Sequence, residues 1–226
     1  MMAWMPPETG QREDFFNEIP ITDEMRKGIV GADKYRMGAA RTAHSDTVIK
    51  QLLNGNSMVK VWLSVGGQQI LHLANTKEVV PALMNLEFFV HVDQFMGPMA
   101  EHADIVLPAA HWLEIDDIFD MHPRFMIEAH NKVVDPPGEA RQDSWIFNEL
   151  GRRLAPQYWF ENVEKMLDYQ LRKANLTWKD FSKMVVLARM GKDQIYYKYK
   201  TDYWRKGGGF PTATGKMELY SIALEK

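Results

Sequence analysis

The chain has 226 residues, of which 46% are hydrophobic and 25% charged, and its formal net charge is −3. This composition is that of a globular protein with one large or two small domains. The weak negative charge argues against nucleic acid or an anionic membrane as a partner, because neither would meet a basic surface. With no cysteine in the sequence, the chain can form no disulfide, no thiolate zinc site and no cysteine-ligated iron–sulfur cluster.

Residues 1–40 form an irregular N-terminal segment in this interpretation. Prolines and glycines interrupt every short periodic stretch, so we expect loop with one or two short helices. The first residues carry no basic region followed by an apolar one, as an export signal would, and no apolar run reaches the roughly 18 residues of a membrane span. The loose mixture of charges at the start leads us to expect a piece of a longer protein.

The next stretch alternates helices and strands. Helical spacing of apolar residues predicts a helix over 42–53 that ends before Gly55, and MVKVWLSV predicts a strand over 58–65. A crossover helix capped by Thr76 should follow, then buried strands over 88–92 and 105–107 with a short helix between them. This order predicts an α/β fold with a doubly wound, mainly parallel sheet of the Rossmann-like kind.

Extra helices are predicted in the C-terminal part. Residues 124–134 should be extended, and Asp143 should cap a helix whose apolar face carries Ile146, Leu150 and Leu154. Two more helices show apolar stripes, the second with a capping box at Thr177 and Asp180, and a last strand is predicted over 216–220. We therefore divide the chain into the segment 1–40 and a domain over 41–226, with a helical insertion at 156–206 and a returning strand at 207–226.

Polar residues follow the first two predicted strands. Gly66, Gly67, Gln68 and Gln69 come after the first strand, and Asp93 and Gln94 after the second. Ligands of open parallel sheets bind outside the carboxyl ends of the strands, and a carboxylate there can accept hydrogen bonds from ribose hydroxyls or a purine edge. The competing interpretations are a simple tight turn at the glycine pair and ordinary surface residues at the strand end. For Asp143, helix capping is a sufficient explanation.

Other chemistries find little support. The histidines and acids between His102 and His122 lack the spacing that places metal ligands on one helix face, which favours a solvated acidic surface. There is no Gly-x-Ser-x-Gly elbow and no cysteine nucleophile. The residues therefore assign neither a catalytic group nor a metal ligand to this chain.

Three strings in order carry a resemblance to a known family. They are VDQFMGPMAEHADIVLPAAHWLEIDD, NKVVDPPGEARQDSWIFNELGRRL and GGFPTATGKMELYS. In this order they resemble the bis-molybdopterin guanine dinucleotide oxidoreductases, the dimethyl sulfoxide reductase superfamily. The resemblance covers roughly residues 40–226 and implies the third, Rossmann-like domain of those enzymes, whose metal ligand and iron–sulfur cysteines would lie elsewhere.

The resemblance implies a cofactor and a site. It implies molybdopterin guanine dinucleotide carrying molybdenum or tungsten in the whole enzyme, and two-electron redox or oxygen-atom transfer there. The residues implied to contact the dinucleotide are Gly66, Gly67, Gln68, Gln69, Asp93, Gln94, Gly97 and Asp143. Gln68 and Gln69 stand where the family usually has Asn-Pro, and Gly97 and Met99 where it usually has threonines, so expected polar contacts are missing.

Two hypotheses of different classes stay open at this point. In the first, the chain is the cofactor-holding domain of a prokaryotic enzyme of the cytoplasm or periplasm, inactive alone, with the remaining domains or subunits as partners. Its exposed domain faces could then drive self-association. In the second, the chain is a non-catalytic binding or assembly module that kept the fold and lost the cofactor. An unrelated nucleotide-binding α/β protein is a weaker third.

Overall fold

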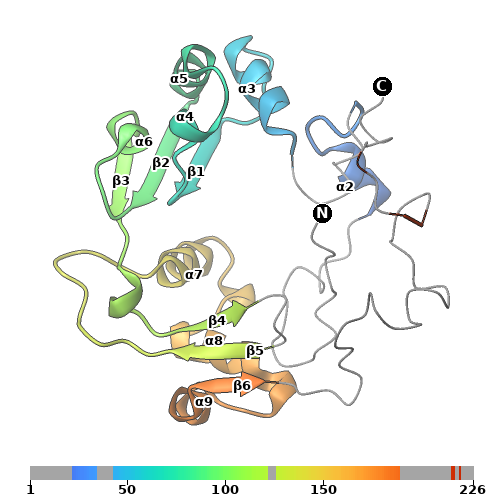
Figure 1. The fold of residues 1–226 in the computed structure, drawn as a ribbon. Coiled ribbons are helices and arrows are strands. Elements are labelled where there is room, and N and C mark those ends of the chain that lie inside the picture. The colour runs from blue at the N-terminus through green and yellow to red at the C-terminus, as the bar shows by residue number, and fades with distance from the viewer. Residues whose placement is uncertain (1–21, 35–42, 122–125, 189–214, 217–218, 220–226) are drawn as a thin grey trace.

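The computed structural model describes residues 22–34, 43–121, 126–188, 215–216 and 219. Its strands form two three-stranded sheets, one parallel and one antiparallel. Figure 1 shows each sheet with its own group of helices, and the chain passes from the first group to the second after β3.

The parallel sheet has the strand order β1-β2-β3. Its strands are β1 (Val61–Val65), β2 (Phe88–Asp93) and β3 (Ile105–Pro108). Val61 pairs with Phe88, and Val90 pairs with Ile105. Helices precede and connect these strands: α2 (Asp23–Lys27), α3 (Ser45–Leu53), α4 (Gln69–His72), α5 (Thr76–Met84) and α6 (Pro98–Glu101). The prediction of an α/β fold with a parallel sheet is confirmed.

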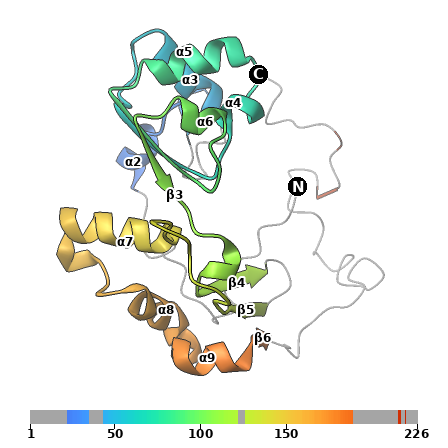
Figure 2. The same cartoon turned by 90° about the vertical axis from the view of Figure 1, so that its left-hand side faces the viewer.

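One hydrophobic cluster holds this sheet to its helices. The views in Figures 1 and 2 place α3 and α5 side by side, and both contribute to the cluster together with α4, α6 and β2. Its buried members are Val48, Ile49, Leu52, Ile70, Val79, Ala82, Leu83, Phe89 and Met99. Burial of this apolar surface, rather than helix propensity, stabilises helices as short as α4 and α6.

The antiparallel sheet was not predicted beyond the extended stretch 124–134. Its strands are β4 (Asp117–Met121), β5 (Met126–His130) and β6 (Val186–Ala188). Asp117 pairs with His130, and Met126 pairs with Ala188. The associated helices are α7 (Asp143–Leu154), α8 (Val163–Leu171) and α9 (Trp178–Met184), with short 3-10 turns η2 (Trp112–Glu114), η3 (Pro156–Tyr158) and η4 (Arg172–Ala174).

A second, separate cluster forms the core of this region. It consists of Ile118, Ile127, Leu167, Leu171, Trp178 and Phe181. The apolar stripe predicted for α8 is therefore confirmed at Leu167 and Leu171. On α9 only the first half of the predicted stripe is buried, because Met184 and Val185 are exposed.

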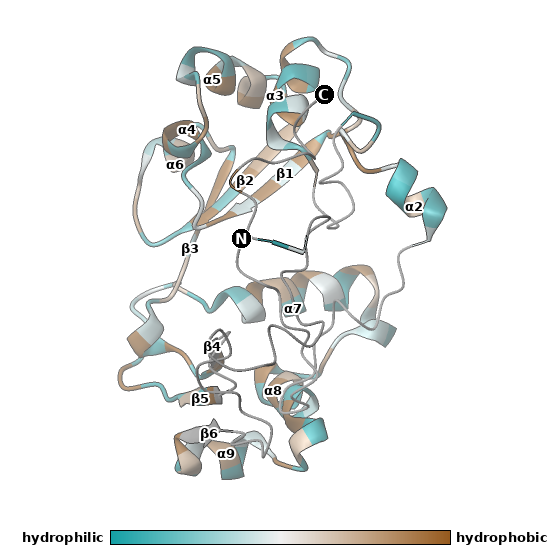
Figure 3. Ribbon diagram, turned by 45° about the vertical axis from the view of Figure 1, so that its right-hand side comes forward, coloured by the Kyte–Doolittle hydropathy of each residue, from teal (hydrophilic) through white to brown (hydrophobic). Residues whose placement is uncertain are grey.

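The predicted apolar face of α7 is wrong as a core face. Leu150 and Leu154 are exposed by 44% and 76%, whereas Asn148 and Gly151 are buried. Asn148 explains the reversal, because its amide donates to Phe160 O at 2.9 Å and its Oδ1 accepts from Phe160 N at 3.1 Å. The hydropathy colouring of Figure 3 shows brown, apolar turns on α7.

Local signals differ in small ways from the predictions. Asn75, not Thr76, is the N-cap of α5, and its φ of 64° is left-handed. Thr177 caps α9 as predicted, accepting from Asp180 N. The predicted last strand lies mostly outside the described residues, and the proposed boundaries at 41, 156 and 207 stay predictions. Within the described part of the chain, no helix is both long and apolar enough to cross a bilayer.

Candidate functional site

The carboxyl edge of the parallel sheet brings together the loops that follow β1 and β2. Gly66 N donates to Val92 O at 2.8 Å, which ties the start of the first loop to the end of the second strand. Gly66 has a φ of +61°, and a side chain built there would meet no atom within 4 Å. The left-handed backbone requires glycine, and the space beside it is open to a ligand.

Asp93 is the centre of the hydrogen bonds at this edge. Its Oδ2 accepts from the Gln68 amide at 2.8 Å and faces His91 Nε2 at 3.2 Å, while its Oδ1 accepts from Phe95 N at 3.1 Å. The side chain of Asp93 is 13% exposed. The Gln68–Asp93 bond joins residues 25 positions apart, because parallel strands end at the same edge.

The protein favours the ionised form of Asp93. Partial burial of the carboxyl acts to raise its pKa, but hydrogen bonds from the backbone N–H groups of Phe95 and Gln94, the Gln68 amide and His91 together hold the pKa below its usual value. The edge therefore presents a fixed negative charge that remains partly accessible to solvent.

Gln68 bridges the two loops. Besides donating to Asp93, it accepts a long bond of 3.4 Å from Met99 N through its Oε1. Gly97 lies directly against it, since a side chain at Gly97 would fall 3.0 Å from the Gln68 amide nitrogen. Gly66, Gly67, Gln68, Asp93 and Gly97 thus lie in the two loops at this edge, and their contact with a dinucleotide stays a prediction.

Among the described hydrogen bonds, the side chains of Gln69 and Gln94 pair with Ser64 and Ala110 rather than with the Asp93 carboxylate. Gln69 Oε1 accepts from Ser64 Oγ at 3.2 Å, and the Gln94 amide donates to Ala110 O at 3.3 Å. Gly67 is packed against the Gln69 side chain. Both glutamine side chains lie at the edge and are held by partners other than Asp93.

Asp143 lies near the same edge but outside this network. Ala109, just after β3, forms a parallel β-bridge with Arg141. Arg141 lies two residues before the start of α7. Gln142 is the N-cap of α7 and Asp143 its first residue, without a side-chain capping bond, so the predicted capping role is wrong. Partial burial and the Asp117 carboxylate raise the pKa of Asp143. No hydrogen bond among the described residues links it to Asp93.

His91 is the residue of this edge that the sequence analysis missed. Its side chain is fully buried, and its Nδ1 has no hydrogen-bond partner in the described structure. Residues i and i+2 of a strand share a face, so the sequence His-Val-Asp already placed His91 beside Asp93. A buried Nδ1 without an acceptor disfavours a proton on that nitrogen, so Nε2 carries the proton and donates to Asp93.

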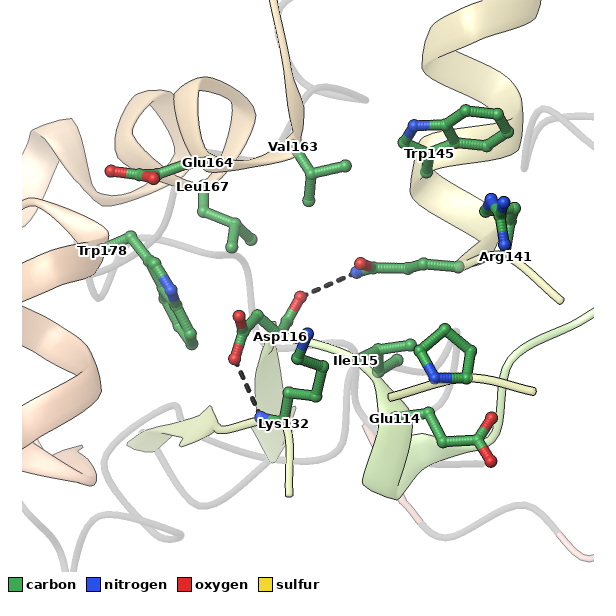
Figure 4. A pocket seen from close by; sticks show the side chains of 12 residues that line it. Glu114, Ile115, Asp116, Lys132, Arg141, Trp145, Val163, Glu164, Leu167 and Trp178 are labelled. Atoms are coloured by element: carbon green, nitrogen blue, oxygen red, sulfur yellow. Dashed lines mark hydrogen bonds between the residues drawn. The ribbon is translucent and has the colours of Figure 1, made fainter. Parts of the chain in front are cut away.

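A separate hollow of about 260 Å³ lies in the second region, between η2, α7, α8 and α9. Figure 4 shows Asp116 at its floor, held by the Gln142 amide at 2.8 Å through its carbonyl and by Lys132 N at 2.8 Å through its carboxylate. Trp145 and Trp178 line opposite sides. None of the eight predicted residues lines this hollow, so it is distinct from the edge.

The acidic residues do not converge on a metal site in the described structure. Across the described ranges, no group of three or more histidine, aspartate or glutamate side chains is placed to hold a metal ion. His111 and Glu114 instead form a capping box around η2, with Glu114 Oε2 accepting from His111 N at 2.8 Å.

Comparison with known proteins identifies the family. The molybdopterin oxidoreductase family model matches residues 26–153. Acetylene hydratase of Syntrophotalea acetylenica is 30% identical over 175 residues, which is 74% of this chain and 22% of that protein. The probable oxidoreductase YyaE of Bacillus subtilis is 36% identical over 164 residues, 71% of this chain and 23% of that protein.

A solved structure shares the fold. Acetylene hydratase from Pelobacter acetylenicus superposes with a TM-score of 0.71, covering 90% of this chain and 31% of that chain at 23% identity. The chain spans less than a quarter of the length of the two curated relatives. On the family match and these identities, this chain belongs to the molybdopterin oxidoreductase family.

Proposed function

We propose that this chain is a cofactor-holding domain of a molybdenum or tungsten oxidoreductase, and that the carboxyl edge of its parallel sheet binds the guanine dinucleotide part of a molybdopterin cofactor. The observation that carries the proposal is Asp93, an ionised and partly exposed carboxylate fixed where two strand-end loops meet. Open parallel sheets bind their ligands at this edge.

The chemistry of the edge suits a guanine nucleotide. Guanine offers an N1–H and an amino group side by side, and a carboxylate accepts such paired donors well. The open backbone at Gly66 leaves room for phosphates or ribose to approach closely. Asp143 follows the Ala109–Arg141 bridge, and the proposed site includes it as a second carboxylate.

In the whole enzyme, the metal and its pterins would supply the two-electron or oxygen-transfer chemistry, and this chain would supply binding and orientation. The exposed apolar residues of α7 support a role as one part of a larger assembly. Phe147, Leu150 and Leu154 are spaced along one face of the helix and are each more than a third exposed, and such an apolar stripe is typical of a face that another domain or subunit covers. The same face could drive self-association of the isolated chain.

A second function, a binding module that lost the cofactor, is favoured by one observation. Asp93 is already surrounded by donors from its own chain, one of them a glutamine at a position where the family usually has another residue. A carboxylate satisfied in this way offers less to a ligand than a free one.

Calorimetric titration of the 226-residue chain with GDP, the nucleotide half of the expected cofactor, tests the proposal. Saturable binding that is lost in Asp93→Ala supports a dinucleotide site at the edge. Binding that is unchanged in Asp93→Ala would place the nucleotide elsewhere and refute the proposed site. Asp143→Ala, measured beside it, reports whether the far part of the edge takes part.

A further inference from the structure

The side chain of Gln68 covers the ligand-facing carboxylate of Asp93. Its amide has a defined orientation, because a carboxylate can only accept and a backbone N–H can only donate. The Nε2 group therefore points at Asp93 Oδ2, at 2.8 Å, and Oε1 points at Met99 N, at 3.4 Å. Gln68 thus presents a donor to the Asp93 carboxylate and an acceptor to the Met99 backbone N–H.

The N–H and C=O groups of the Gln68 amide form the same donor and acceptor pair that the cyclic amide of a guanine base presents. In guanine, N1–H lies beside the O6 carbonyl, so a base that placed N1–H on Asp93 would hold its carbonyl oxygen on the side of Met99 N. The Gln68 amide imitates that edge with the chain's own atoms. A guanine base and the Gln68 amide therefore compete for the same hydrogen-bonding groups.

The hydrogen-bonding capacity of Asp93 makes the competition strict. A carboxylate has about four lone-pair sites, and the Gln68 amide, His91 and the backbone N–H groups of Phe95 and Gln94 all donate to Asp93. The carboxylate cannot accept a base that donates through both N1–H and its amino group until an existing donor leaves. His91 is fully buried, and Phe95 donates from the main chain, whereas Gln68 is a partly exposed side chain on a loop.

We propose that Gln68 is a displaceable latch on Asp93, which an incoming guanine nucleotide must release and whose presence weakens nucleotide binding. The inference rests on the proposed nucleotide site at this edge. In the free chain the latch holds the Asp93 carboxylate in place, and it would lower the affinity of this edge for a nucleotide. Gly97 supports the latch because its missing side chain leaves the space that the Gln68 amide occupies, 3.0 Å from where a Cβ would lie.

The test compares GDP titrations of the unaltered chain, Gln68→Ala, Asp93→Ala and a matched control, Gln157→Ala. Gln157 is an exposed glutamine of η3, away from the edge. Loss of one hydrogen bond to a charged group predicts that Gln68→Ala binds GDP roughly tenfold more tightly. Gln157→Ala should bind as the unaltered chain does, and circular dichroism of each variant checks folding.

The outcomes separate the latch from the site itself. Binding that is lost in Asp93→Ala and tightened in Gln68→Ala supports the latch. Binding that is lost in Asp93→Ala but equal or weaker in Gln68→Ala overturns the latch and leaves the site standing. Binding indifferent to Asp93→Ala refutes the site, and the latch with it. If GDP binds neither the unaltered chain nor Gln68→Ala, the latch is also overturned.

A second measurement follows the latch directly. In a nitrogen-15 correlation spectrum, the side-chain amide signal of Gln68 is assigned as the one missing from Gln68→Ala. Release from Asp93 on GDP binding should move this signal toward the position of a solvent-exposed glutamine amide. A signal that stays in place at saturating GDP would contradict displacement.

Discussion

The two sheets of this molecule arrange their polar residues in opposite ways. In the parallel sheet, strand ends meet at one edge, so Gln68 and Asp93 touch although 25 residues separate them. In the antiparallel sheet, neighbouring strands run in opposite directions and Asp117 pairs with His130 within one hairpin. A parallel sheet gathers distant loops into a site, whereas the antiparallel region here chiefly builds a core and an exposed helix face.

The largest expected loss of stability comes from substitutions in the two hydrophobic clusters, and these substitutions test whether the clusters unfold independently. Phe89 in the first cluster and Phe181 in the second are 2% and 0% exposed. Replacing either with alanine should cost about 3–5 kcal/mol, because each leaves a cavity in a packed cluster. Hydrogen exchange followed by mass spectrometry should show the loss of protection confined to the region that carries the substitution.

The two phenylalanine variants serve as controls for each other. If Phe181→Ala lowers protection in β1 and β2 as much as in β4 and β5, the two clusters unfold as one unit. The two hydrophobic clusters would then be separate in space but would not unfold independently.

The next prediction compares two glycines with different neighbours. A side chain at Gly151, on α7, would collide with the Trp159 ring, whereas one at Gly97 would meet only the end of the Gln68 side chain. Gly151→Ala should therefore cost about 1–3 kcal/mol from overpacking, in spite of the better helix propensity of alanine. Gly97→Ala should cost less than about 1 kcal/mol, because Gln68 can swing away. Urea unfolding of both variants checks the order, and equal costs would contradict it.

A third prediction concerns the charge at the edge. Asp93→Asn should lower the free energy of unfolding by about 1–2 kcal/mol at pH 7, because it removes charge-assisted hydrogen bonds. In the folded protein, hydrogen bonds to the carboxylate lower the pKa of Asp93 below that of a free aspartate. Its stabilising contribution is therefore complete above about pH 4 and is lost as the pH falls through the lower folded pKa.

Urea unfolding at several pH values measures this dependence. The difference between the unaltered chain and Asp93→Asn should shrink below about pH 4. A difference that persists at pH 2 would assign the effect to packing rather than to the ionised carboxylate.

The smallest expected effect on stability comes from replacing Asp143. Burial and the neighbouring Asp117 raise the pKa of Asp143 in the folded protein. The protonated form therefore stabilises the fold at low pH, and this contribution is lost as the pH rises through the folded pKa. Asp143→Asn should therefore raise the melting temperature slightly at pH 7. The gain in the free energy of unfolding should be less than about 1 kcal/mol, because the carboxyl group is partly exposed. No gain should remain at low pH.

Asp33→Asn, at an exposed acid, is the matched control for this measurement and should change little at either pH. If Asp143→Asn were destabilising at pH 7, the favourable interaction of Asp143 with the start of α7 would outweigh the cost of its burial.

Sequence and structure agree most closely in the first region. The apolar runs at Phe88–Asp93 and Ile105–Pro108 were recognisable as strands, with polar residues directly after the first of them. The predicted burial holds for β2, whose Phe89, His91 and Val92 are buried, but is wrong for β3, in which no residue is buried. His91 and Asp93, two residues apart in β2, share a face of the sheet, and the sequence alone indicates this. Apolar periodicity likewise located α8 and its buried leucines.

The tertiary structure alone decided the rest. Gln68 and Asp93 could be placed near one edge from the sequence, but whether a glutamine amide would reach a carboxylate depends on loop geometry that no local pattern encodes. The apolar spacing of α7 predicted a core face, yet Asn148 is buried because it satisfies the backbone of Phe160, twelve residues away. Local periodicity determines where helices and strands form, whereas burial is decided by which distant partners satisfy each polar group.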